Sequence, residues 1–92
     1  MKVKVRFFAR FKELLGTDIV VDAATGIALN GLIRDIAAKN SEGYDEIFDE
    51  NGTFKDFVIL MRNGKRIDST DAPQTKIEDG DEIAVFPPVA GG

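Results

Sequence analysis

An amphipathic stripe near the middle of the chain constrains the fold more than any other feature of the sequence. Five apolar residues between positions 25 and 39 recur at i, i+3, i+4, i+7 and i+8, the spacing of one face of an α-helix. They are Leu29, Leu32, Ile33, Ile36 and Ala37. Thr25 precedes them and is the predicted N-cap. Because a chain of 92 residues has room for a single hydrophobic core, the other elements must pack against this helix.

Apolar and polar residues alternate on both sides of this helix, and the alternation predicts strands. In the first run, Val3, Val5 and Phe7 lie on one side and the intervening residues lie on the other. The second run is expected to return antiparallel to the first. The predicted strands cover residues 3–8, 18–22, 57–62, 65–67 and 82–86.

Glycines mark the ends of several elements. Gly16 follows a predicted short helix over residues 9–15, at the C′ position where left-handed backbone is needed. Asn63-Gly64 is a strong signal for a β-hairpin between the third and fourth strands. Residues 41–56 are less periodic, although three residues indicate a turn of helix that packs on the core. These are Tyr44, Ile47 and Phe48.

The order of the elements is strand, strand, helix, strand, short strand, strand, which predicts an α+β protein of the β-grasp type. A mixed sheet of four to five strands is expected to carry one main helix on one face. The first and last strands should lie side by side and parallel at the centre, because the helix supplies the crossover that parallel pairing needs. Residues 1–86 would form this domain, and residues 87–92 a flexible C-terminal tail.

Missing residue types exclude several classes of protein. The chain has no cysteine and no histidine, so it lacks a disulfide framework, a thiolate nucleophile and the commonest general base. Its formal net charge of −4 disfavours nucleic acid as a partner, because phosphate backbones are bound by clustered lysine and arginine. We expect no catalytic residue, no metal site and no bound cofactor.

The first ten residues carry charges at alternate positions instead of an apolar run. This pattern matches neither a signal peptide nor a membrane span. We therefore expect a cytoplasmic protein that does not bind membranes and is a monomer when free.

Two acidic clusters have alternative interpretations. The first lacks the spacing of an EF-hand, which favours solvated loop charge over a calcium site. It consists of Asp45, Glu46, Asp49 and Glu50. The second, Asp79, Asp81 and Glu82, fits either a tight turn, which Asp-Gly sequences favour, or a contact with basic residues of a partner.

The C-terminal sequence FPPVAGG is the candidate functional site. Pro87 and Pro88 cannot donate backbone hydrogen bonds, so they end the last strand. The six residues from Pro87 to Gly92 can reach about 20 Å from the sheet. Gly91 and Gly92 have no Cβ, so this end of the backbone can enter a narrow channel. The Gly92 carboxylate is a poor electrophile, and its activation would need an external enzyme with MgATP because this chain has no phosphate-binding loop.

The first and last strands also predict a docking patch for partner proteins. If their apolar residues face the helix, then Phe8, Ala84 and Phe86 lie on the other face of the sheet, near the tail. Alternatively, Phe8 and Phe86 pack against Phe11, Leu14 or a neighbouring loop as a small second core. The expected partner contacts are Phe8, Ala84, Phe86, Pro87, Pro88, Val89 and Ala90.

Two segments resemble the small subunit of molybdopterin synthase, in the MoaD/ThiS group of ubiquitin-like sulfur carriers. They are FARFKELLGTD, residues 8–18, and DGDEIAVFPPVAGG, residues 79–92. A third segment, DENGTFKDFVILMRNG, residues 49–64, also resembles the small archaeal modifier proteins, relatives that are attached to lysines of other proteins. The resemblance implies a ubiquitin-like fold and a covalent co-substrate instead of an enzyme.

The resemblance further implies that an adenylating enzyme of the ubiquitin-activating type acts on Gly92, which then becomes a thiocarboxylate. As a sulfur carrier, the tail would enter the large subunit of molybdopterin synthase and deliver sulfur to a pterin precursor. As a modifier, Gly92 would form an isopeptide bond with a target lysine. A third alternative is a ubiquitin-like binding module whose tail is inert. All three share one fold, so the fold cannot separate them.

Overall fold

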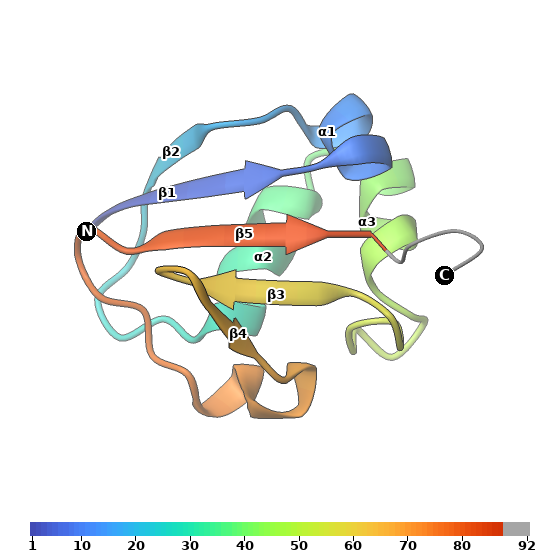
Figure 1. Cartoon of the computed structure of the whole chain (residues 1–92). Coiled ribbons are helices and arrows are strands. Elements are labelled where there is room, and N and C mark those ends of the chain that lie inside the picture. Colours follow the sequence, from blue (N-terminus) through green and yellow to red (C-terminus); the bar gives the residue numbers. More distant parts are fainter. Residues whose placement is uncertain (88–92) are drawn as a thin grey trace.

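The computed structural model of the chain describes residues 1–87, and Figure 1 shows the order of its elements in space. The strands are β1 (Lys2–Phe7), β2 (Ile19–Asp22), β3 (Ile59–Arg62), β4 (Lys65–Ile67) and β5 (Glu82–Phe86). The helices are α1 (Ala9–Leu15), α2 (Leu29–Ala37), α3 (Ser41–Ile47) and a 3₁₀ helix, η1 (Ser69–Gln74).

The five strands form one mixed sheet in the order β2-β1-β5-β3-β4. β1 pairs antiparallel with β2 and parallel with β5, while β3 lies antiparallel to both β5 and β4. In Figure 1, α2 and α3 lie behind the sheet. This confirms the predicted β-grasp architecture, including the parallel pairing of the first and last strands.

The hydrophobic core lies between the sheet and α2. All five residues of the amphipathic stripe are buried, and Leu29, Ile33 and Ala37 are fully enclosed. From the sheet, Val3, Val5 and the inward residues of β3 and β5 complete the same cluster. The alternating burial of β1 and β5 follows the predicted parity, so each of these strands has one covered and one open face.

The start of α2 differs from the prediction. The helix begins at Leu29 after Ala28, and no side chain caps it, so the predicted N-cap at Thr25 is wrong. Thr25 and Gly26 instead form a turn, with Gly26 at a φ of 85°. The backbone supplies what a cap would have supplied, because the Leu29 amide donates to the Thr75 carbonyl at 2.8 Å.

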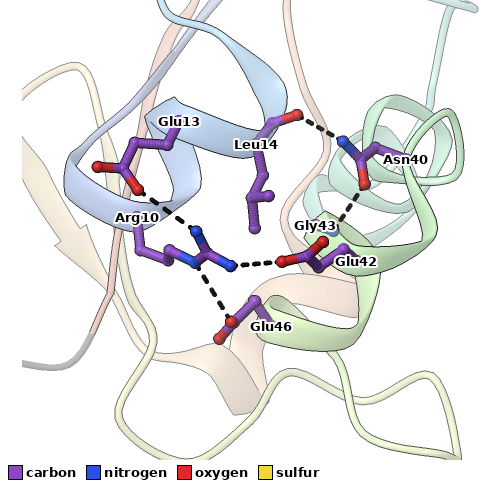
Figure 2. A network of polar contacts seen from close by, with 7 residues as sticks. All are labelled: Arg10, Glu13, Leu14, Asn40, Glu42, Gly43 and Glu46. Atoms are coloured by element: carbon purple, nitrogen blue, oxygen red, sulfur yellow. Dashed lines mark hydrogen bonds and ion pairs between the residues drawn. The ribbon is translucent and has the colours of Figure 1, made fainter.

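The acidic segment after α2 forms a true helix, α3, with a cap that the sequence analysis did not identify. The Asn40 side chain accepts a hydrogen bond from the Gly43 amide at 3.1 Å and donates to the Leu14 carbonyl at 2.8 Å (Figure 2). One side chain therefore caps α3 and satisfies a carbonyl of the last turn of α1. A Cβ on Gly43 would lie 2.8 Å from the Leu15 side chain, so glycine lets the two helices approach closely.

The turn before β5 is organised by Asp81, which is buried. Its carboxylate accepts hydrogen bonds from Arg62 Nε at 2.9 Å, from Asn63 Nδ2 at 2.9 Å and from the Glu78 amide at 2.8 Å. Burial alone would raise the pKa of Asp81, but the hydrogen bonds from Glu78, Asn63 and Arg62 outweigh it and lower that pKa. The partner-contact interpretation is therefore wrong for Asp81, which is a turn former.

The neighbouring acidic residues also make contacts within the chain. Asp79 accepts from the Lys2 amide at 2.8 Å, and the exposed Glu82 carboxylate lies 3.6 Å from the Lys4 ammonium.

In the hairpin between β3 and β4, Asn63 and Gly64 have φ values of 49° and 83°. Positive φ at both central residues is typical of a type I′ turn, which confirms the predicted β3–β4 hairpin.

Replacing Asp81 tests whether its carboxylate holds the turn before β5 against the β3–β4 hairpin. Asp81→Asn is expected to lower the free energy of unfolding near neutral pH by about 1–3 kcal/mol, because an amide nitrogen replaces an oxygen that accepts hydrogen bonds. The folded-state pKa is lowered, so the contribution is present above the unfolded value of about 3.9 and is lost as the pH falls through the folded value.

Urea unfolding of the wild type and Asp81→Asn at a series of pH values measures this loss. The difference in unfolding free energy should shrink as the solution becomes acid. Asp45→Asn, which changes an exposed carboxylate, is the control and should show little difference at any pH. A difference for Asp81→Asn that stays constant into strong acid would contradict the assignment.

Candidate functional site

The parallel pairing of β1 and β5 places the C-terminal ends of both central strands at the same end of the sheet. Phe7 lies opposite Val85, and the Phe8 amide donates to the Val85 carbonyl at 3.3 Å. β5 ends at Phe86, and Pro87 follows directly. The point where the chain leaves the sheet therefore lies beside the junction between β1 and α1.

An aromatic pair marks this exit. Phe8 and Phe86 stack with ring centroids 4.2 Å apart and an interplanar angle of 10°, and both are half-buried. The Arg6 guanidinium lies 5.8 Å from the Phe8 ring centroid, within cation–π range. Phe11 belongs instead to the main core. Phe8 and Phe86 thus cover each other on the open face of the sheet, as the parity of their strands predicted.

The open face contains further apolar residues that the sequence analysis did not assign. In the β3–β5 ladder, Ile59 lies opposite Phe86 and Met61 lies opposite Ala84. Ile59, Met61 and Ala84 are all partly exposed, whereas Leu60 between the two β3 residues is buried in the core. The predicted patch of Phe8, Ala84 and Phe86 therefore continues across β3.

A groove of about 390 Å³ lies next to the exit and includes Pro87 in its wall. Its remaining lining comes from α1, α3 and the segment before β3. These residues are Arg10, Phe11, Glu46, Lys55, Phe57 and Val58. The groove connects the last described residue of the chain with side chains that are distant in sequence.

Arg10 joins the two helices at this groove (Figure 2). Its guanidinium contacts Glu13 of α1 at 3.4 Å, Glu46 of α3 at 3.5 Å and Glu42 of α3. The hydrogen bond to Glu13 raises the pKa of Arg10, burial opposes this effect, and the charges of Glu42 and Glu46 add to it. The arginine is therefore a permanent cation that positions α1 against α3.

The backbone bends sharply where β1 ends. Ala9, immediately after Phe8, has a φ of 53°. A non-glycine residue in this left-handed region is strained by about 1–2 kcal/mol. The strain lies at the first residue of α1, directly after Phe8 of the aromatic pair.

Two residues of the first acidic cluster, Glu46 and Asp49, take part in local structure. Asp49 accepts hydrogen bonds from the amides of Asn51 and Thr53 at 2.9 and 3.0 Å, which stabilises a turn at Gly52. Over residues 1–87, no three acidic side chains are grouped as a metal site would require. In the same part of the chain, no helix is both long and apolar enough to cross a membrane.

The remaining predicted site residues, three partner contacts and the two glycines of the activation site, lie outside the described part of the chain. They are Pro88, Val89, Ala90, Gly91 and Gly92. Their expected roles therefore stay predictions.

A β-grasp body whose central strand ends beside an apolar open face defines a small ubiquitin-like protein. The chain belongs to the ThiS family, whose model matches residues 5–92. It is 34% identical over 97 residues to small archaeal modifier protein 3 from Haloferax volcanii, with all of both chains covered. It is 36% identical over 90 residues to the molybdopterin synthase sulfur carrier subunit from Escherichia coli, covering 98% of this chain and 99% of that protein.

Solved structures agree with this assignment. Small archaeal modifier protein 1 from Haloferax volcanii superposes with a TM-score of 0.85 at 25% identity over the whole of both chains. A chain in the complex of subunits 1 and 2 of the molybdopterin-converting factor from Helicobacter pylori matches with a TM-score of 0.62 at 32% identity, again over both full lengths. Members of this family therefore include sulfur carriers, protein modifiers and subunits of protein complexes.

The aromatic pair gives a test of the predicted docking patch. Phe86→Ala removes one stacked ring from a half-buried site. The free energy of unfolding should fall by the contribution of one aromatic pair, about 0.5–1.5 kcal/mol, in addition to the contribution of the apolar area that is no longer buried. Binding to the adenylating enzyme expected to act on Gly92 should weaken about tenfold or more, as for an interface hot spot.

Urea unfolding and calorimetric titration measure the two effects separately. Tyr44→Ala is the matched control, because Tyr44 is also half-buried and packs against Phe48 with centroids 4.9 Å apart, on α3. It should change stability without changing enzyme binding. A Phe86→Ala variant that loses stability but binds as tightly as the wild type would rule out the patch.

Proposed function

We propose that the chain is a sulfur carrier for molybdopterin biosynthesis, activated at the carboxylate of Gly92. The observation that carries the proposal is that the family match extends through residue 92. The structure supports it, because the last strand ends beside the Phe8–Phe86 pair. The body is recognised by partners, and the terminal carboxylate reacts.

The chemistry needs two steps on other proteins. In the first, a Gly92 carboxylate oxygen attacks the α-phosphorus of ATP, held as its magnesium complex by the adenylating enzyme, and pyrophosphate leaves. In the second, a sulfur nucleophile at the oxidation level of hydrosulfide attacks the acyl carbon and displaces AMP, which leaves a thiocarboxylate. The chain has no cysteine, so the sulfur must come from a donor protein or small molecule.

The proposed acceptor is the large subunit of a molybdopterin synthase. Support comes from the similarity to the Escherichia coli sulfur carrier subunit and to the two-subunit complex from Helicobacter pylori. The docking contacts in this proposal are Phe8, Ala84, Phe86 and Pro87 on the described body, together with Pro88, Val89 and Ala90.

A second candidate function is that of a protein modifier. The similarity to small archaeal modifier protein 3 over the full length of both chains favours it. In this role the ε-amine of a target lysine attacks activated Gly92, and an isopeptide bond forms. Both functions share the activation step, whereas an inert-tailed binding module would need no activation.

Intact-mass analysis tests the proposal. After incubation with the adenylating enzyme, MgATP and a sulfur donor, the chain should gain the mass of one oxygen-to-sulfur exchange. Because no lysine or arginine follows Lys76, trypsin should confine the gain to the peptide of residues 77–92. Omission of ATP should abolish it.

A variant that lacks Gly91 and Gly92 is the matched control, because it keeps a terminal carboxylate but on Ala90, closer to the body by about 7 Å. It should gain no sulfur. Sulfur gain by this variant, or none by the wild type, would contradict the carrier function. Recovery from cells of lysines that bear the 77–92 remnant, without a thiocarboxylate form, would favour the modifier instead.

A further inference from the structure

Phe57 is exposed to an unusual degree for a large apolar residue. Of its side chain, 76% is accessible, compared with 62% for Val20, the other large apolar residue that is exposed in the described part of the chain. An isolated exposed apolar residue is common on protein surfaces and needs no explanation by itself. The surroundings of Phe57 distinguish it from such a case.

The turn that carries Phe57 is fixed at both ends. Phe54 and Val58 are buried in the core on either side of it. The Lys55 amide donates to the Ile47 carbonyl at 2.9 Å, and the Val58 amide closes the turn onto the Lys55 carbonyl at 3.2 Å. The phenyl ring is therefore displayed by a tied backbone, which reduces the entropy lost when a partner covers it.

Phe57 also stands between two grooves. One is the exit groove, which it shares with Pro87. The other has a volume of about 490 Å³ and extends towards Arg66 and Ile67 of β4. A ring between two hollows presents most of its surface to any protein that covers this end of the molecule.

The length of the tail sets where that protein must lie. Five residues follow Pro87, and fully extended they span at most about 17 Å. Under the proposed function, a partner that acts on Gly92 must therefore approach within this distance of Pro87, which lines the same groove as Phe57.

We propose that Phe57 inserts into an apolar pocket of the protein that receives the tail, as an anchor separate from the Phe8–Phe86 pair. This inference rests on the proposed activation of Gly92. It goes further by naming a residue through which the activating enzyme recognises the chain. The partner needs a concave apolar pocket for one phenyl ring, beside the channel that admits the Gly-Gly terminus. Anchors of this kind, aromatic and central to an interface, carry much of the binding energy in protein complexes.

The test uses the adenylating enzyme and its ATP–pyrophosphate exchange, with the chain as the varied substrate. Phe57→Ala should raise the concentration of chain that gives half-maximal exchange about tenfold or more, as for an interface anchor, and leave the maximal rate unchanged. Phe57→Leu should recover part of the loss, because it restores an apolar side chain. Val20→Ala removes an exposed apolar residue from β2, at the opposite edge of the sheet, and should change the value less than twofold.

Thermal unfolding of each variant checks that the fold is intact. Because both positions are exposed, the unfolding temperatures should stay close to that of the wild type. If Phe57→Ala has the same half-maximal concentration as the wild type, the inference is overturned. It is also overturned if sedimentation shows that the wild type self-associates and that Phe57→Ala does not, because Phe57 would then be covered by a second copy of the chain. Exchange that persists without Gly91 and Gly92 contradicts the proposed function instead. The two failures are therefore distinguishable.

Discussion

The parallel pairing of β1 with β5 is the interaction on which the rest of the structure depends. A parallel pair cannot be closed by a hairpin, so the chain must cross over the sheet, and α2 with its buried stripe forms that crossover. The same pairing places the C-terminal ends of the first and last strands side by side, where Phe8 meets Phe86. The site is thus a direct product of the topology: residues 78 positions apart in sequence become a stacked pair beside Pro87.

At both ends of the sheet, the polar groups of the body are satisfied mainly within the chain. Arg10 is held by three glutamates, Asp81 accepts from Arg62, Asn63 and a backbone amide, and Asn40 caps α3. These contacts fix α1, α3 and the β3–β4 hairpin relative to the sheet. The open face beside the exit carries the partly exposed apolar residues Phe8, Phe86, Ile59 and Met61, and an exposed apolar patch often marks a site of protein interaction.

Much of the fold could be predicted from the sequence, because the stripe of α2 and the alternation of β1 and β5 are strong local patterns. The cap at Thr25 was wrong because a tertiary contact, the Thr75 carbonyl, satisfies the helix start. Residues 57–61 are all apolar, so no alternation shows which side chains face outwards, and only the register with β5 places Ile59 and Met61 on the open face. The left-handed backbone at Ala9 has no signal in the sequence, since alanine favours helix interiors.

The central claim is that the terminal carboxylate reacts and the folded body presents it. The most direct measurement compares two forms of the chain that differ only at Gly92, one with a free carboxylate and one with a carboxamide, in ATP–pyrophosphate exchange with the adenylating enzyme. The account predicts exchange with the carboxylate and none above background with the carboxamide, although both forms should bind the enzyme. Equal exchange with the two forms would contradict it.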